Sequence, residues 1–141
     1  MLLALAFPER PDKIPVVLLV EDHRDTRAMY SEFLRGAFEV LEAADGEQAL
    51  AVLRTRVPDL VVTDLSLPVL DGFQLILRIR QEPSLRDLPV ISLSGFGGHV
   101  HDERARQAGC DRILQKPCLP DALAEAVSDL LRERTGRSRQ S

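Results

Sequence analysis

The sequence contains little cysteine, few aromatic residues and almost no lysine. Of its 141 residues only two are cysteines, Cys110 and Cys118, and no Cys-x-x-Cys motif is present. Two cysteines do not make a disulfide framework in a domain of this size. We therefore expect two reduced thiols in a cytoplasmic protein. Lys13 and Lys116 are the only lysines, so a lysine that falls within a motif is informative.

Long hydrophobic runs are also missing. No apolar stretch approaches the roughly 18 residues that a membrane-spanning helix needs, so we expect no membrane partner. The apolar opening, residues 1–7, lacks a basic leader and is followed at once by Pro-Glu-Arg-Pro, which argues against a secretory signal. The net charge of -4 argues against nucleic acid as a partner. The length and ordinary composition favour one globular domain whose hydrophobic core needs no disulfide or metal cross-links.

Five short apolar stretches alternate with five helical patterns. This alternation, with short connections, predicts an α/β fold: a doubly wound parallel sheet with right-handed crossovers and helices on both faces. We expect an extended or disordered lead-in over residues 1–15, the globular domain over 16–134 and a short basic tail over 135–141. The expected strands lie at about 16–20, 38–43, 60–64, 90–93 and 112–115, and the expected helices at about 24–36, 45–57, 72–80, 99–108 and 121–134.

Four of the predicted strands end in polar residues that can carry chemistry. The ends are Glu21-Asp22, Asp64, Ser94 and Lys116. In a doubly wound sheet these ends share one edge, around the crevice where ligands bind. Carboxylates brought so close repel one another unless a cation joins them. An all-oxygen, carboxylate-rich cluster suits Mg²⁺, and Lys116 adds a further positive charge.

Each of these residues, taken alone, has an ordinary structural explanation. Asp22 could cap the helix that follows it, Lys116 could be a surface residue and Ser94 a turn residue. Their joint placement at four strand ends is what favours a site. The histidines His23, His99 and His101 we expect to be surface residues, because the two members of a His-x-His pair point to different sides of a helix.

The motifs occur in the order of a known family. They are Glu21-Asp22, the Asp-Leu-Ser-Leu-Pro segment 64–68 leading to Asp71-Gly72, Ser94-Gly95, Ala108-Gly109, and Lys116-Pro117. With them, the chain from about Val16 to Leu131 resembles the receiver domain of bacterial two-component response regulators, in the stand-alone form typical of chemotaxis regulators. The resemblance implies a flavodoxin-like (βα)5 sandwich with strand order 2-1-3-4-5.

The resemblance also implies a phosphoacceptor, a metal site and a switch. A sensor histidine kinase or a histidine phosphotransfer protein would supply the phosphoryl group, and the peptide bond before Pro117 would be cis. The implied roles are Asp64 as phosphoacceptor, Glu21, Asp22, Asp64 and the main-chain carbonyl of Ser66 as Mg²⁺ ligands, Ser94 as the switch hydroxyl that hydrogen-bonds the phosphoryl group, and Lys116 as its charged partner.

The charge count supports the same set. Three carboxylates contribute about -3, Mg²⁺ +2 and Lys116 +1, so the resting pocket is near neutral, and an acyl phosphate replaces about -1 on Asp64 with about -2. The surplus must be met by the metal, Lys116 and Ser94. The sequence departs from the family at Ile113, where an aromatic residue usually reports the switch.

We therefore expect a phosphorylation-controlled interaction module rather than an enzyme. It would dock an unknown downstream protein or relay the phosphoryl group, as a monomer or weak dimer. Two alternatives stay open. One is a degenerate receiver that acts as a phosphorylation-independent scaffold. The other is an aspartate-based, Mg²⁺-dependent phosphohydrolase, although such enzymes typically carry a second Asp where this chain has Ser66.

Overall fold

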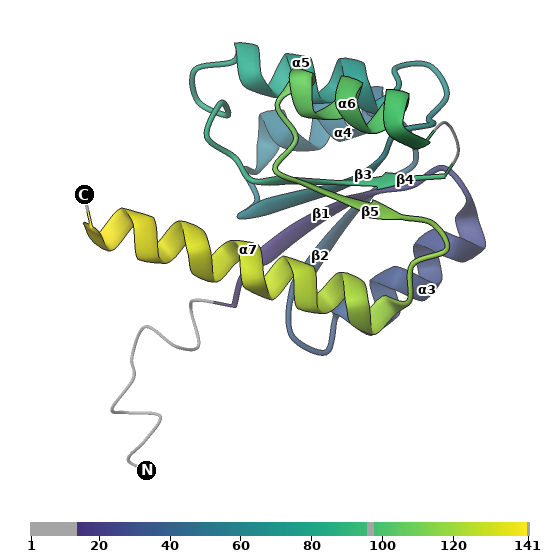
Figure 1. Ribbon diagram of the computed structural model, residues 1–141. Helices are drawn as coiled ribbons and strands as arrows, with labels where there is room; N and C mark the ends of the chain where they lie inside the picture. Colours follow the sequence, from purple (N-terminus) through teal and green to yellow (C-terminus); the bar gives the residue numbers. More distant parts are fainter. Residues whose placement is uncertain (1–13, 96–97, 141) are drawn as a thin grey trace.

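The computed structural model describes residues 14–95 and 98–140, and only the backbone at 98–99 and 136–140. In this part of the chain five strands alternate with five helices (Figure 1). All strand pairs are parallel, and the order across the sheet is β2-β1-β3-β4-β5. The elements are β1 (Val16–Val20), α3 (Arg24–Leu34), β2 (Glu39–Ala43), α4 (Gly46–Thr55), β3 (Leu60–Asp64), α5 (Gly72–Gln81), β4 (Val90–Ser94), α6 (Gly98–Ala108), β5 (Arg112–Gln115) and α7 (Pro120–Gln140).

The three central strands form the buried spine of the sheet. Every residue of β3 and β4 is buried, and only Val16 of β1 is partly exposed. Strands covered on both faces are mainly apolar, as these are apart from Thr63, Asp64, Ser92 and Ser94. The outer strands β2 and β5 keep exposed or half-buried positions. The charged and polar residues of the outer strands suit their exposure: Glu39 and Glu42 in β2, and Arg112 and Gln115 in β5.

Helices cover both faces of the sheet and divide the core in two. Figure 1 shows α4, α5 and α6 on one face and α3 and α7 on the other. The first half of the core packs α5 residues such as Leu75 and Ile76 against Leu18 and Val61. The second half packs Tyr30 and Leu34 of α3 and Leu123, Val127 and Leu130 of α7 against the opposite sides of the same strands.

The predicted fold class, strand order and sequence of elements are confirmed. Two details of the last helix differ. It begins at Pro120, so Asp121 lies inside the first turn, where its side chain accepts from the Ala122 amide at 2.8 Å, and is not the residue before the helix. Its backbone continues to Gln140, past the end expected near Arg134. Most of the predicted lead-in and the Phe96-Gly97 link lie outside the described residues, and the domain boundaries stay a prediction.

None of the helices within the described ranges has the length and apolar composition needed to cross a membrane.

Candidate functional site

Asp64 is the last residue of β3, and its carboxylate is held from two sides. Its residue is only 4% exposed. One oxygen, Oδ1, accepts a hydrogen bond from the Ser66 amide at 3.1 Å, and the other, Oδ2, accepts from Lys116 Nζ at 2.6 Å. The apolar run 60–62 buries the strand, and the turn after it brings the Ser66 amide back to the carboxylate. A buried carboxylate is thus met by one positive charge and one amide.

Glu21 follows β1 and is more deeply buried, at 1% exposure. Its oxygens accept from Lys116 Nζ at 3.1 Å and from the His23 amide at 3.0 Å. Burial raises the pKa of Glu21 and the nearby charge of Asp64 raises it further, while the His23 amide and Lys116 act in the opposite direction. The two carboxylates share one cation, so the acidic charge exceeds the basic charge here.

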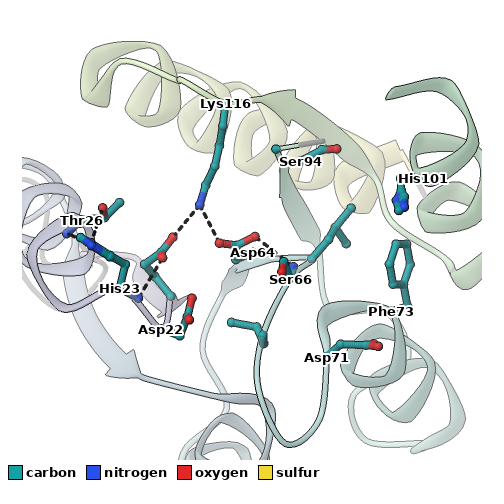
Figure 2. A pocket seen from close by; sticks show the side chains of 14 residues that line it. Asp22, His23, Thr26, Asp64, Ser66, Asp71, Phe73, Ser94, His101 and Lys116 are labelled. Atoms are coloured by element: carbon teal, nitrogen blue, oxygen red, sulfur yellow. Dashed lines mark hydrogen bonds and ion pairs between the residues drawn. The ribbon is translucent and has the colours of Figure 1, made fainter. Parts of the chain in front are cut away.

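Lys116 follows β5 and reaches across the end of the sheet to both carboxylates (Figure 2). Burial lowers its pKa, but the hydrogen bonds and charges of Asp64 and Glu21 outweigh burial and leave the pKa of Lys116 raised. The ammonium group is therefore fully charged at neutral pH. The peptide bond between Lys116 and Pro117 is cis, as the family resemblance implies.

Asp22 stays available because a different residue caps the next helix. The residue before α3 is His23, whose ring Nδ1 accepts from the Thr26 amide at 3.4 Å and lies 3.0 Å from its hydroxyl. The structural explanation of Asp22 as a helix cap is therefore wrong. The side chain of Asp22 is instead part of an acidic cluster: one carboxylate oxygen from each of Glu21, Asp22 and Asp64 lies within 4.8 Å of the others.

Ser94 ends β4 beside this cluster, and its hydroxyl has no partner. The residue is buried, and its Oγ makes no hydrogen bond to any described group. Buried hydroxyls are nearly always hydrogen-bonded, so an orphaned one calls for an explanation. Ser94 lines the same cleft as Asp64 and Lys116. Its hydroxyl is thus positioned for a polar group that enters from outside.

The cleft over these residues has a volume of about 730 Å³. Phe73 of α5 and His101 of α6 line the side of the cleft away from Asp22 (Figure 2). There the ring of His101 stands edge-on to Phe73 at 5.9 Å between centroids, and the Arg104 guanidinium lies 4.0 Å from the centre of the Phe73 ring. His101, predicted to be a surface residue, is half-buried and lines the cleft. His23 is exposed, as predicted, and the side chain of His99 lies outside the described residues.

A family model described as the response regulator receiver domain matches residues 17–128. The chain belongs to the response regulator receiver domain family. Response regulator Rre1 of Synechocystis sp. is 35% identical over 117 residues, which are 82% of this chain and 51% of Rre1. The polar-differentiation response regulator DivK of Brucella anthropi is 28% identical over 116 residues, 82% of this chain and 94% of DivK. This receiver therefore spans about half of Rre1 and nearly all of DivK.

A solved structure agrees with these sequence relatives. The chemotaxis protein CheY4 of Vibrio cholerae superposes with a TM-score of 0.78 at 28% identity, covering 82% of this chain and 98% of CheY4. The receiver thus has the flavodoxin-like fold that its motifs imply.

The residues of this receiver fit a hard divalent cation. The donor set is all oxygen, two of its three carboxylates are buried, and only one lysine offsets them. Mg²⁺ takes few carboxylates and keeps several waters, which the open cleft can supply. The structure brings together all the side chains predicted for the site. Sequence reasoning missed the wall that Phe73 and His101 form, whose only signal was a His within a polar helix.

Proposed function

We propose that Asp64 accepts a phosphoryl group from a sensor histidine kinase or a histidine phosphotransfer protein. The observation that carries the proposal is the joint arrangement of a buried carboxylate, a lysine at 2.6 Å and an unpartnered buried hydroxyl in one cleft. The first can accept the group, the second can offset its charge, and the third can hydrogen-bond its oxygens. The family of the chain supports the same role.

The transfer would begin with Asp64 ionised. A carboxylate oxygen attacks phosphorus while the bond from phosphorus to the donor's imidazole nitrogen breaks. The electron pair of that bond stays on the nitrogen, and the product is an acyl phosphate. Lys116 holds a positive charge beside Oδ2 of Asp64 throughout. The Ser66 amide orients the carboxylate through Oδ1, so the lysine-bound Oδ2 faces a different direction.

Mg²⁺, when bound by Glu21, Asp22, Asp64 and the Ser66 main-chain carbonyl, would supply charge neutralisation on the phosphoryl oxygens. The new group carries more negative charge than the carboxylate it replaces. Ser94 would then gain the partner that its hydroxyl lacks. Because Ser94 precedes the connection to α6, this new hydrogen bond would bias that helix and change the surface offered to a downstream protein.

The proposal also includes the partners, the oligomeric state and the cellular compartment. The partners would be a phosphodonor protein and one downstream protein, and the receiver would act as a monomer or weak dimer. Cys110 and Cys118 are both free thiols, which supports a reducing compartment such as the cytoplasm.

Acetyl phosphate and Mg²⁺ test the proposal directly. We expect intact-protein mass spectrometry to find a labile mass increase of one phosphate, which Asp64→Asn and EDTA each abolish. Asp71→Asn is the matched control, because Asp71 lines the same cleft as the N-cap of α5 and Asn caps a helix equally well. It should be phosphorylated like the parent.

Two other outcomes would favour the alternatives. If neither a small phosphodonor nor a kinase modifies the protein, the phosphorylation-independent scaffold becomes the favoured interpretation. Release of phosphate from a free phosphomonoester over many cycles would indicate a phosphohydrolase.

A further inference from the structure

The loop between β3 and α5 contains a strained turn. Val69 has φ of 70°, in the left-handed region that a β-branched residue rarely adopts. The Leu70 amide donates to the Pro68 carbonyl at 2.7 Å, two residues back, so Val69 is the central residue of a γ-turn. A γ-turn with positive φ is rare and strained. Such a conformation persists only where the surroundings impose it on the backbone.

Two close backbone approaches impose this conformation. A Cβ on Gly46, at the start of α4, would collide with the Leu70 carbonyl oxygen and lie 2.7 Å from Leu70 Cβ. A Cβ on Gly72 would collide with the Asp64 carbonyl oxygen and lie 2.7 Å from Leu65 Cα. The Gly72 amide also donates to the Leu65 carbonyl at 3.0 Å. The loop is thus closed at its base by Gly72 and held at its far end by Leu70 against Gly46.

The segment between these two anchors has little freedom left. The ring of Pro68 locks its own φ and restricts Leu67 to extended conformations. Val69 is already confined to the γ-turn. A displacement of Leu70 therefore cannot be absorbed locally, and it must pass back along the loop to Ser66. Ser66 lies beside Asp64 at the other end of this stiff segment (Figure 2).

We infer that Gly46 is a positioning residue for the cation site, which it sets through Leu70 and the stiff loop that carries Ser66. Gly46 lies outside the cleft and touches none of the reacting groups. The inference rests on the proposed Mg²⁺ site and adds to it a determinant on α4. According to this inference, the absence of a side chain at position 46 increases the affinity for the ion and does not only serve packing.

The test measures the affinity of the unphosphorylated full chain for Mg²⁺. The chain is titrated with MgCl₂, and the amide NMR shifts of the loop report binding. Gly46→Ala should raise the Kd for Mg²⁺ about tenfold, the size of effect seen when residues that support metal ligands are changed. The amides of Ser66 and Leu70 should be shifted before any ion is added. With acetyl phosphate, saturating Mg²⁺ should restore the phosphorylation rate of the variant, because the reacting groups are intact.

Two control variants separate positioning from loss of stability. Gly36→Ala places a Cβ at an ordinary 3.4 Å from the Phe33 carbonyl oxygen and should leave the Kd unchanged. Leu53→Ala removes a buried side chain of α4, so it should lower the melting temperature without changing the Kd. If Gly46→Ala fails to fold, Leu70→Gly removes the Cβ atom that lies against Gly46 and frees the loop backbone at this anchor, so it should raise the Kd in the same way.

The failures are distinguishable. Absence of Mg²⁺ binding by the parent protein would overturn the ion site and the inference together. Binding by the parent with an equal Kd for Gly46→Ala would overturn the inference and leave the proposed function standing. A rise in Kd for Leu53→Ala as large as that for Gly46→Ala would also overturn it, because the effect would then follow stability alone.

Discussion

The two ends of the sheet treat their buried polar groups in opposite ways. At the amino end, where the strands begin, Arg80 of α5 directs its guanidinium into the loops before β4 and β5. Every N–H of that guanidinium has a partner. They are the main-chain carbonyls of Gly109, Arg86 and Leu88 and the carboxylate of Asp111, at 2.7 to 3.0 Å. Asp111 in turn accepts from the Val90 amide at 2.9 Å.

At the carboxyl end of the strands, buried hydroxyl and carboxylate groups have too few hydrogen-bond partners. The Ser94 hydroxyl has none among the described residues, and Glu21 and Asp64 share the single ammonium of Lys116. A protein gains stability by satisfying its buried polar groups, so this shortfall works against folding. The contrast teaches that the amino end holds the receiver together, whereas the carboxyl end keeps interactions unmade for a ligand.

Removing Arg80 should have the largest effect on stability. Arg80→Ala removes all five of these guanidinium hydrogen bonds, so we expect the free energy of unfolding to fall by about 3 kcal/mol. Urea denaturation measures this loss. Arg78→Ala is the matched control, because Arg78 is an exposed arginine on the same helix, and its loss should change stability by less than about 0.5 kcal/mol. Equal losses for the two variants would contradict the role of the Arg80 hydrogen bonds.

Most of the fold and the core of the site follow from the sequence. The short, mainly apolar runs predict the buried strands, and the polar residue at the end of each run predicts what meets at the carboxyl edge. Residues next to a strand are placed by the topology alone. This is why Glu21, Asp64 and Lys116 were predictable before any distance was known.

The features that were not predictable depend on contacts between elements distant in sequence. His101 becomes part of the cleft wall only because α6 packs on α5 and brings its ring against Phe73. No periodicity in α6 signals this, since that helix is polar on most of its surface. Likewise, the sequence does not distinguish Arg80 from any other arginine at the end of a helix, because its hydrogen bonds go to loop carbonyls that only the fold brings near it. In the same way, Gly46 lies against Leu70, the neighbour of the strained Val69, although it is far from that loop along the chain.

Two serines on β4 allow a sharper comparison, because both are buried and only one has a partner. Ser92 Oγ lies 2.9 Å from Cys110 Sγ, whereas Ser94 Oγ has no partner among the described groups. Ser92→Ala should therefore lower the free energy of unfolding by about 1 kcal/mol, and Ser94→Ala should raise it by about 1 kcal/mol, since it removes an unsatisfied hydroxyl. Urea denaturation of both variants in EDTA shows whether each substitution lowers or raises the free energy of unfolding. A loss on both substitutions would contradict the idea that Ser94 is kept unsatisfied.

The smallest effect concerns the pH dependence of two glutamates with opposite surroundings. Burial, aided by the charge of Asp64, raises the pKa of Glu21 above its ordinary 4.5. At Glu42 burial acts in the same direction, but hydrogen bonds from Ser31, Arg35 and Arg27 outweigh it, and the pKa of Glu42 is lowered. The folded state therefore holds a proton more tightly at Glu21 and less tightly at Glu42 than the unfolded chain does.

These shifts predict opposite slopes of stability against pH. The contribution of Glu21 is complete below about pH 4.5 and is lost as the pH rises through its raised value, whereas that of Glu42 is complete above about pH 4.5 and is lost as the pH falls through its lowered value. Relative to the parent, Glu21→Gln should thus gain stability as the pH rises, and Glu42→Gln should lose it. Urea denaturation in EDTA from neutral pH down to about pH 3 measures both differences. Parallel changes in the two variants would contradict the raised pKa of Glu21, because only a carboxylate whose pKa is raised on folding stabilises the folded state by taking up a proton.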